Sequence, residues 1–339
     1  MQSALNLARQ GLGRVAPNPS VGCVIVKDGH VVGRGRTADG GRPHAETRAL
    51  DMVGVQAKGA TAYVTLEPCA HEGETPPCAT ALINAGIKKV FVSIIDTDAR
   101  VAGQGVAMLV KAGIDVEVGL CEDQAYDLNK GFFLRHSYNR PFISLKTATS
   151  SDGKIADANG HSKWITGELA RRRAHLIRAQ HDAIGVGVNT VLMDNPSLTT
   201  RLDGVEHRSK VIVFDRKSRL TGKEKIFENN PLIITNPNLQ DAMRELSEQG
   251  ITRLLVEGGA GLVSAFLKEN LYDQLYWFKA PKAMGEGLDA IAHFNIESLT
   301  NETNLVHAEQ IQLNEDTLDI YKAPSLREQR NFGRSNPET

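Results

Sequence analysis

The sequence contains few cysteines and no long apolar run. Four cysteines in 339 residues are too few for a disulfide framework, which excludes a fold held together by disulfide bonds. No run of about eighteen apolar residues is present, so we expect no membrane-spanning helix. Residues 1–13 have an amphipathic helical pattern without the apolar centre of a signal peptide. We therefore expect a protein of the reducing cytoplasm, where neighbouring cysteines more often hold a metal.

The chain also lacks a dominant charge. Its formal net charge is −1 and its pI is about 6.8, so no overall field attracts nucleic acid or an anionic membrane. We expect neither of these as a partner. The expected partners are small molecules and, in a homo-oligomer, further copies of the chain. Internal repeats and low-complexity runs are absent as well.

The length of the chain suits two domains of ordinary size. Residues 1–120 begin with a helix and a hairpin that turns at Asp28 and Gly29, and they continue with alternating helices and strands. This order predicts a layered α/β domain with helices on both faces of one sheet. Residues 121–140 have the pattern of a connecting helix, which Pro141 cannot continue.

The second half, residues 141–322, repeats the α/β class with a different sequence. Strands are expected at residues 141–149, 181–188, 209–215, 231–236 and 251–259, and helices at residues 168–180, 239–249 and 261–269. Residues 272–280 and 305–323 alternate like antiparallel edge strands. Residues 323–339 are polar and rich in helix breakers, so we expect a disordered tail.

Two segments of the first domain carry metal-binding side chains. PHAE supplies His44, and EPCAHEGETPPC supplies Cys69 and Cys78. Imidazole and thiolate are the ligands that zinc prefers, and three protein ligands leave a fourth position for water. Glu46 is too close to His44 to share its ligand direction, but it is well placed to move the proton of that water. This is the His-x-Glu pattern of zinc-dependent base deaminases, in which the glutamate is not a ligand.

Each part of this pattern has a simpler interpretation. A lone His-x-Glu recurs by chance, and two cysteines in a cytoplasmic chain are often buried small residues. Cys69 and Cys78 lie further apart than the usual Cys-x-x-Cys, so the loop between them must bow out and return. Together, and in this order, we interpret them as a zinc site. Cys23 and Cys121 are expected to be structural, and His71 is either a solvated loop residue or a substrate contact.

These segments are similar to a known family. The resemblance to the N-terminal domain of the bifunctional deaminase/reductases of riboflavin biosynthesis, the RibD family, is carried by APNPSVGCVIVKDGHVVGRG, GRPHAE, TLEPCAHEG, TPPC and VAGQGVAMLVKAGIDVEVGL. It implies a cytidine-deaminase-like fold with three α/β/α layers. It also implies that Asn18 and His71 contact the pyrimidine, and that Glu46 moves protons beside a zinc ion held by His44, Cys69 and Cys78.

Three positions depart from the family pattern. The family usually has histidine at Thr37, lysine or arginine at Glu74, and Asp-Pro-Asn-Pro where this chain reads DTDA at residues 96–99. A basic residue at position 74 would neutralise a substrate phosphate, whereas a carboxylate has the wrong sign. Another arginine could take over this role, although for any single one we favour a solvated surface charge. The candidates are Arg34, Arg36, Arg42 and Arg100.

The second domain has a glycine-rich turn in LLVEGGAGLVSAFL, residues 254–267. Its glycines let backbone N–H groups approach an anion, and the positive end of the following helix suits a dinucleotide pyrophosphate. A tight strand-to-helix turn also needs glycine for its own geometry, and the Rossmann pattern G-x-G-x-x-G is absent. Arg178 is a candidate anion partner, whereas Arg171 to Arg173 fit a solvated helix face. Trp164 is either a core aromatic or a site residue.

Residues 141–322 resemble the C-terminal domain of the same family, through SDGKIA, SKWIT, TVLMDNPSLTTR and EGG. This implies a dihydrofolate-reductase-like α/β fold that uses NADPH. The residues implied for NADPH are Ala148, Trp164, Thr190, Asp194, Gly259, Ala260, Gly261, Leu262, Val263, Ser264 and Ala265. Those implied for the phosphorylated substrate are Ser162, Arg178, Leu198, Arg201 and Glu257, with Lys146 near the reacting sugar.

The sequence thus predicts a bifunctional enzyme of flavin synthesis. It would deaminate 2,5-diamino-6-(5-phosphoribosylamino)pyrimidin-4-one by zinc-dependent hydrolysis and then reduce the ribosyl group with NADPH, giving 5-amino-6-(5-phosphoribitylamino)uracil. One alternative is a deaminase for another base, including one in tRNA, with a degenerate second half; the near-neutral charge argues against its basic groove. The other is a noncatalytic protein that keeps one domain for dimerisation or ligand sensing, and intact site residues in both domains argue against it.

Overall fold

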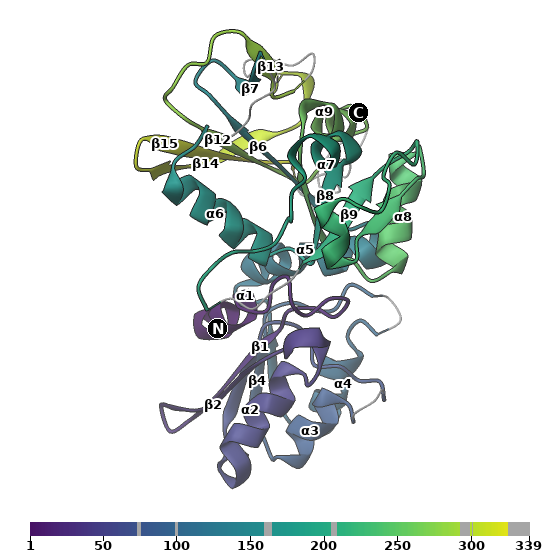
Figure 1. Ribbon diagram of the computed structural model, residues 1–339. Helices are drawn as coiled ribbons and strands as arrows, with labels where there is room; N and C mark the ends of the chain where they lie inside the picture. The colour runs from purple at the N-terminus through teal and green to yellow at the C-terminus, as the bar shows by residue number, and fades with distance from the viewer. Residues whose placement is uncertain are drawn as a thin grey trace, which may run out of the picture. The chain divides into compact units, whose positions relative to one another are not determined.

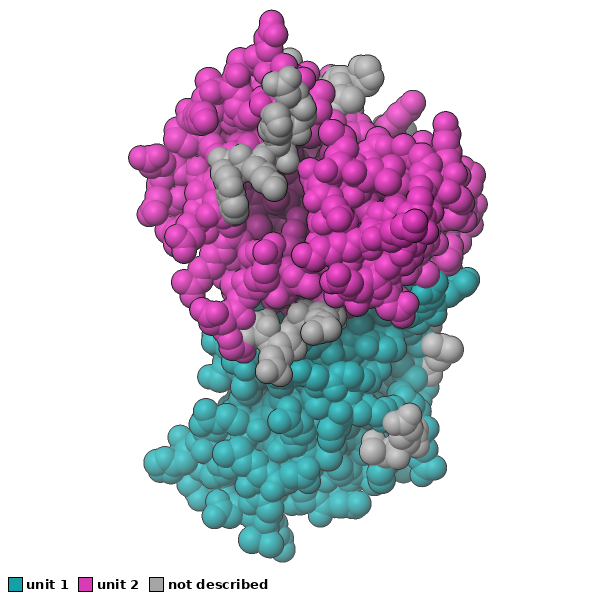
Figure 2. Space-filling model, viewed as in Figure 1, with its two compact units in different colours: residues 1–141, 246–252 teal, residues 142–245, 253–339 magenta. Residues whose placement is uncertain are grey.

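The computed structural model describes residues 1–72, 76–98, 101–158, 165–204, 209–291, 299 and 301–324. The chain forms two compact units, which Figure 2 colours separately. The first comprises residues 1–141 and 246–252, and the second residues 142–245 and 253–339. The tail predicted to be disordered lies, from residue 325 onward, outside the described residues. No helix in the described ranges is long and apolar enough to cross a membrane.

A five-stranded sheet lies at the centre of the first unit (Figure 1). In the spatial order β2-β1-β3-β4-β5, its strands are β1 (Gly22–Lys27), β2 (His30–Arg36), β3 (Thr61–Val64), β4 (Lys89–Val92) and β5 (Asp115–Val118). β1 pairs antiparallel with β2 and β3, whereas β3, β4 and β5 run parallel. Asp28 and Gly29 both have positive φ, as a two-residue hairpin turn requires, so the predicted hairpin is confirmed.

Helices cover both faces of this sheet. They are α1 (Gln2–Arg9), α2 (Ala45–Val53), α3 (Cys78–Asn84), α4 (Gln104–Lys111) and α5 (Glu122–Tyr138), with short 3-10 turns at Asp39–Gly41 and Gly54–Ala57. A side chain at Gly22 of β1 would collide with the backbone of Ala4 in α1, and one at Gly35 of β2 with the backbone of Ala45 in α2. Gly35 lies opposite Cys23, the neighbour of Gly22, so α1 and α2 pack on opposite faces.

The hydrophobic core of the first unit fills the space between the sheet and its helices. Cys23 is fully buried there, and Cys121 at the start of α5 packs against it, so both have the structural role that the sequence predicted. The helix predicted to follow the last strand of this domain is α5.

An eight-stranded sheet forms the second unit, in the order β10-β9-β8-β11-β6-β12-β15-β14. Its strands are β6 (Phe142–Thr149), β8 (Ala183–Gly187), β9 (Lys210–Phe214), β10 (Leu232–Ile234), β11 (Arg253–Glu257), β12 (Gln274–Lys279), β14 (Val306–Leu313) and β15 (Asp316–Lys322). The strands from β10 to β12 run parallel, and β15 and β14 are antiparallel additions. β7 (Lys154–Asp157) and β13 (Gly287–Asp289) form a separate antiparallel pair.

One strand lies deeper in this sheet than the sequence pattern suggested. Residues 272–280 were expected to form an antiparallel edge strand, but β12 pairs parallel with β6 on one side and antiparallel with β15 on the other. Leu275, Tyr276, Trp277 and Phe278 are all buried, so both faces of the strand are covered. Such continuous burial is typical of parallel strands, and alternation alone does not reveal it.

The helices of the second unit are α6 (Glu168–Ala179), α7 (Val188–Asp194), α9 (Ala260–Lys268) and the part of α8 (Leu239–Glu248) that precedes residue 246, with a 3-10 turn at Lys225–Asn229. α6 packs through Ala170 and Ile177 onto β11, β12 and β15. Parallel strands have their carboxyl ends at one edge of the sheet. β11 ends at this edge with Glu257, and the glycine turn to α9 follows directly.

Candidate active sites

The three zinc-ligand candidates come from different parts of the first unit. His44 lies immediately before α2, Cys69 follows β3, and Cys78 is the first residue of α3. The Nδ1 atom of His44 lies 3.7 Å from the Sγ of Cys69 and 3.3 Å from the Sγ of Cys78. All three ligand atoms lie within 4.8 Å of one another. Cys69 and Cys78 therefore meet at one site although eight residues separate them.

This donor set fits one zinc ion. Bonds of about 2.0 Å to nitrogen and about 2.3 Å to sulfur place tetrahedral ligand atoms about 3.6 Å apart, close to the separations here. Among the described residues the cluster has three members, which leaves a fourth position for water. Hydrogen bonds from Cys78 and His44 lower the pKa of Cys69 to about 4, whereas the hydrogen bond with Cys69 and burial raise the pKa of Cys78, so one of the two sulfurs favours the thiolate form.

Glu46 lies in the first turn of α2 and is not one of the three ligand candidates. Only 3% of its surface is exposed, and this burial raises the pKa of its carboxyl group to about 7. A carboxyl group with a pKa near neutral can both accept and donate a proton at the pH of the cell.

The zinc-ligand candidates His44 and Cys69, together with Glu46, line a cavity of about 470 Å³, a size typical of small-molecule sites. Asn18 and His71, which the resemblance assigned to the pyrimidine, line the same cavity. Asn18 donates from Nδ2 to the carbonyl oxygen of Gly41 at 2.8 Å, which fixes the orientation of its amide. The structure thus brings together every described residue predicted for the first site.

Thr37 also lines this cavity, at a position where the resemblance leads one to expect histidine. Its hydroxyl donates to the carbonyl oxygen of Pro19 at 3.1 Å and accepts from the backbone N–H of Val21 at 3.0 Å. The residue is only 2% exposed. Thr37 therefore anchors the backbone of the cavity wall and brings no charge to the site.

Glu67, which is not one of the predicted ligand or substrate residues, holds one wall of the cavity. Its carboxylate accepts four backbone N–H groups at 2.8 to 3.2 Å, from Asp96, Gly103, Gly105 and Val106. These donors flank the loop before α4 and its first turn, and residues of that loop line the cavity. The sequence signal was its place directly before Pro68 and Cys69, in the run that follows β3.

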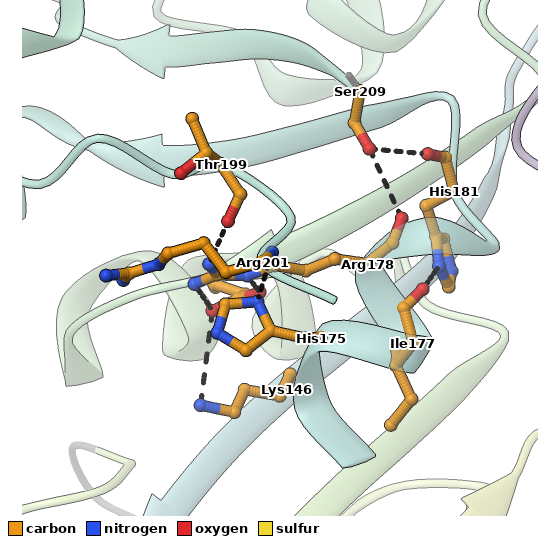
Figure 3. A network of polar contacts seen from close by, with 9 residues as sticks. Lys146, His175, Ile177, Arg178, His181, Thr199, Arg201 and Ser209 are labelled. Atoms are coloured by element: carbon orange, nitrogen blue, oxygen red, sulfur yellow. Dashed lines mark hydrogen bonds and ion pairs between the residues drawn. The ribbon is translucent and has the colours of Figure 1, made fainter. Parts of the chain in front are cut away.

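The second unit joins several residues predicted for the phosphorylated substrate (Figure 3). Arg178 on α6 forms a two-point ion pair with Glu257 at the end of β11, with Nε to Oε1 at 2.6 Å and Nη2 to Oε2 at 2.8 Å. Lys146, in register with Glu257 on the neighbouring strand, places its Nζ 4.0 Å from Oε2. Burial would raise the pKa of Glu257, but Arg178 and then Lys146 outweigh it and lower the pKa to about 2. Two cations around one carboxylate leave a net positive charge, which suits a phosphate.

Arg201 joins this network through His175, a histidine outside the predicted site residues. The backbone N–H of Arg201 donates to Nδ1 of His175 at 3.3 Å, while Nη1 of Arg178 donates to the carbonyl oxygen of Thr199 at 3.1 Å (Figure 3). Burial, and then Arg178 and Arg201, lower the pKa of His175 to about 4, so its ring is neutral near neutral pH. His175 stands three residues before Arg178 on α6, which was the only signal in the sequence.

The glycine turn, residues 258–261, forms a hydrogen bond with Thr190, another residue that the resemblance assigns to NADPH binding. The backbone N–H of Gly259 donates to Oγ1 of Thr190 at 3.3 Å, and α9 begins at the next residue, Ala260. Its first backbone N–H groups are therefore available to an anion. Asp194 is exposed at the end of α7, and Ala148 lies on β6 opposite Phe278.

Some predicted positions are buried or lie outside the described residues. Leu198 is 7% exposed and packs in a hydrophobic cluster, and Val263 is fully buried. A contact from either one to a ligand would have to go through its backbone. Ser162, Trp164 and Glu74 lie outside the described residues, as do Ala99 and Arg100.

Two family models match the chain. The model described as the cytidine and deoxycytidylate deaminase zinc-binding region matches residues 1–94, and that of the RibD C-terminal domain matches residues 141–317. The riboflavin biosynthesis protein RibD of Aquifex aeolicus is 40% identical to this chain, over 95% of this chain and 97% of its own length. The chain belongs to the RibD family.

Other RibD proteins match with similar coverage. The Escherichia coli protein is 41% identical over 84% of this chain and 88% of its own length. Among solved structures, Acinetobacter baumannii RibD is 40% identical with a TM-score of 0.88, covering 96% of this chain and 98% of its own. The Thermotoga maritima deaminase/reductase is 35% identical with a TM-score of 0.88, covering 96% and 97%.

Membership of the RibD family confirms the predicted class of enzyme. The chain is a bifunctional deaminase and reductase of riboflavin biosynthesis, with a zinc-binding deaminase domain followed by a reductase domain. The predicted fold class, a cytidine-deaminase-like α/β domain followed by an α/β reductase domain, is confirmed as well. A noncatalytic role is therefore set aside.

Proposed function

We propose that this chain performs two successive reactions on one phosphorylated pyrimidine. The first is hydrolytic deamination of 2,5-diamino-6-(5-phosphoribosylamino)pyrimidin-4-one, in a domain that spans residues 1–120. The second is reduction of the ribosyl group by NADPH to give 5-amino-6-(5-phosphoribitylamino)uracil, in a domain that spans residues 141–322, with residues 121–140 as the connection. The observation that carries the proposal is the convergence of His44, Cys69 and Cys78 on one point beside the buried Glu46, at a cavity that His44, Cys69 and Glu46 line.

In the deamination, the residues of the chain bind, orient and move protons. His44, Cys69 and Cys78 would hold a zinc ion, which supplies a Lewis acid that makes water acidic near neutral pH. Glu46 accepts a proton from the attacking water and passes it to the amine nitrogen, which leaves as ammonia. Asn18 and His71 hold the pyrimidine ring so that its amine-bearing carbon faces Glu46.

In the reduction, the network around Glu257 binds the substrate. Arg178 and Arg201 hold the phosphate, Lys146 lies near the reacting sugar, and Glu257 keeps Arg178 in place. Ser162 and the backbone of Leu198 complete the substrate set. NADPH supplies the hydride for the open-chain form of the sugar, and the protein contributes orientation.

The cofactor would lie along the glycine turn. The first N–H groups of α9 face its pyrophosphate, and Thr190 holds the turn in place. The remaining contacts come from residues that the resemblance names, of which only Trp164 is outside the described residues. They are Ala148, Trp164, Asp194 and the segment from Gly259 to Ala265.

The assembly and location of the chain are part of the same proposal. We propose a cytoplasmic homo-oligomer that acts on small molecules and has neither nucleic acid nor a membrane as a partner, because its net charge is close to zero. Sedimentation of the purified chain tests the oligomer, since a mass equal to one chain at all concentrations would contradict it. A chain that sediments with membranes would contradict the location.

A coupled assay tests the two reactions in turn. The zinc-loaded chain is given the diaminopyrimidine phosphate, and ammonia is measured first; NADPH is then added and the loss of its absorbance is followed. We expect ammonia release without NADPH, followed by NADPH oxidation in proportion to the ammonia formed. Ammonia release without NADPH oxidation would show that the second domain does not act on the product of the first. Release of ammonia from a tRNA but not from the pyrimidine would contradict the proposed substrate.

A further inference from the structure

The cavity of the first unit contains more acids than cations. The proposed substrate carries a phosphate, so one end of it needs a positive partner. The described acids that line the cavity are Glu46, Glu67, Asp96 and Asp98, and the histidines are His44, His71 and His136. Among the described lining residues, Arg42 is the only arginine or lysine.

None of the other arginines that could have served is among the described residues that line the cavity. Arg36 donates to the carbonyl oxygen of Thr37 at 2.7 Å and to the carboxylate of Asp39 at 2.8 Å. Arg34 is exposed on β2 and is not among the lining residues. Thr37 cannot replace a histidine, because its hydroxyl is bound to backbone on both sides. Arg100 lies outside the described residues.

The backbone around Arg42 is fixed on both sides. The amide of Asn18 donates to the carbonyl oxygen of Gly41 at 2.8 Å, and the backbone N–H of Ala38 donates to the carbonyl oxygen of Pro43 at 3.0 Å. A side chain at Gly41 would come within 2.6 Å of the Asn18 amide, so this close approach requires glycine. Arg42 itself is half-buried. The same contacts that orient Asn18 toward the cavity therefore hold the Arg42 backbone next to it.

We infer that Arg42 binds the phosphate of the substrate in the deaminase cavity of this chain. A guanidinium group can hold a phosphate through two parallel hydrogen bonds, and Asp96 and Asp98 repel a phosphate from the part of the wall that they form. Arg42 thereby takes the role for which the related family uses a basic residue at position 74, where this chain has glutamate. The inference rests on the proposed function for the presence of a phosphate on the substrate.

The test compares two pyrimidines that differ only in the phosphate. Ammonia release is measured for the diaminopyrimidine phosphate and for the same compound without its phosphate, with the wild-type chain and Arg42→Gln. Loss of one charged hydrogen-bonding partner predicts a rise in KM of about 10- to 100-fold for the phosphorylated compound. The KM of the phosphate-free compound should stay within about twofold, because it makes no such contact. Zinc content and melting temperature check that the fold is retained.

Three further variants sharpen the result. Arg42→Lys keeps the charge and should recover part of the loss. Glu74→Lys placed in the Arg42→Gln chain should restore a low KM for the phosphorylated compound, because it supplies the basic residue that the family usually has at this position. Arg34→Gln, an exposed arginine outside the cavity, is the matched control and should leave both KM values unchanged.

An equal loss for both pyrimidines, or no loss for either, would overturn the inference. Failure of the proposed function would look different: the wild-type chain would release no ammonia from either compound. In that case, calorimetry still decides the role of Arg42. It measures how tightly the diaminopyrimidine phosphate binds to the wild-type chain and to Arg42→Gln. Weaker binding to Arg42→Gln supports it, and equal binding rejects it.

Discussion

The two sites of this chain are assembled over different distances in the sequence. The ligand candidates and Glu46 come from two short segments, residues 44–46 and 69–78. The network around Glu257 draws instead on β6, α6, the segment after α7 and β11, which are spread over residues 146–257. A metal site can be compact because the ion itself brings its ligands together, whereas the charged side chains of this second site come from separate elements that the sheet brings to one edge.

The sites also differ in how their charges are balanced. In the first, thiolate and imidazole groups surround one position, and a divalent cation bound there would neutralise the thiolate charge. In the second, Arg178 and Lys146 surround the single carboxylate of Glu257, so an anion is needed to complete the balance. One site is therefore prepared for a metal and the other for a phosphorylated ligand. If this contrast holds, a substitution in one site should abolish the activity of that site and leave the activity of the other site intact.

The largest effect is expected at Glu46. Glu46→Gln removes the group that moves the proton but none of the three zinc ligands, so ammonia release should fall about 10²- to 10⁴-fold with zinc content unchanged. Reduction of the deaminated intermediate, supplied directly, should keep its wild-type rate. Asp51→Asn, an exposed carboxylate on the same helix, is the control and should change neither activity. A Glu46→Gln chain that deaminates at near the normal rate would show that another group moves the proton.

The second prediction concerns the ion pair of the other unit. Glu257→Gln leaves the guanidinium of Arg178 buried without its charge partner, which should destabilise the second unit by about 3–5 kcal/mol. Both tryptophans of the chain, Trp164 and Trp277, belong to this unit, so urea unfolding followed by tryptophan fluorescence reports on it. Ammonia release should be unchanged at urea concentrations below the transition.

Asp241→Asn provides the matched control for this measurement. It removes an ion pair with Arg244 that is exposed on α8 of the same unit, and exposed pairs contribute little. The free energy of unfolding should change by about 0.5 kcal/mol or less. Similar losses in Glu257→Gln and Asp241→Asn would show that the buried pair does not stabilise the unit more than a surface pair does.

The metal site was predictable from the sequence because its chemistry restricts which residues can form it. Few residue types bind zinc, and His44, Cys69 and Cys78 stood in an order that left one arrangement to test. The alternating pattern of helices and strands likewise predicted both α/β units. Neither prediction required knowledge of which strand lies beside which.

Features that depend on strand neighbours were not predictable in this way. The segment that became β12 alternates like an edge strand, yet it lies between β6 and β15 with both faces covered. Thr37 differs from the family pattern, and only the fold shows that its hydroxyl is bound to Pro19 and Val21. In the sequence, His175 is a polar residue on a helix with no sign of a special role. Only the fold shows that the backbone N–H of Arg201 lies beside its ring.

A third prediction concerns how the stability of the second unit changes with pH. His181 is fully buried, with Nδ1 2.7 Å from the carbonyl oxygen of Ile177 and Nε2 2.8 Å from the hydroxyl of Ser144. Burial, with a smaller effect of Arg253, lowers its pKa to about 3. The unfolded chain binds this proton near pH 6.5, so the stability that the neutral ring provides is complete above that pH and is lost as pH falls toward 3.

From pH 7 to pH 5 this difference amounts to about 2 kcal/mol for the second unit. Urea unfolding followed by tryptophan fluorescence at the two pH values measures it. His181→Gln should lower stability at pH 7 and show a smaller loss on going to pH 5. An equal pH dependence in the wild type and the variant would mean that other groups cause the loss. His175 shifts in the same direction but is partly exposed, so it contributes less.

The smallest effect is expected at the glycine turn, where the second site depends on backbone groups and not on charge. Thr190→Val keeps the shape of the side chain but removes the oxygen that accepts the Gly259 N–H, so the turn loses one neutral hydrogen bond. This bond is worth about 0.5–1.5 kcal/mol, and the KM for NADPH should therefore rise about 2- to 10-fold. Thr190→Ser keeps the hydroxyl and should leave the KM unchanged, and NADPH binding followed by tryptophan fluorescence gives a measure independent of turnover. If Thr190→Val instead raises the KM for the pyrimidine and not for NADPH, the turn belongs to the phosphate network around Glu257, and the division of this edge into a cofactor side and a substrate side is wrong.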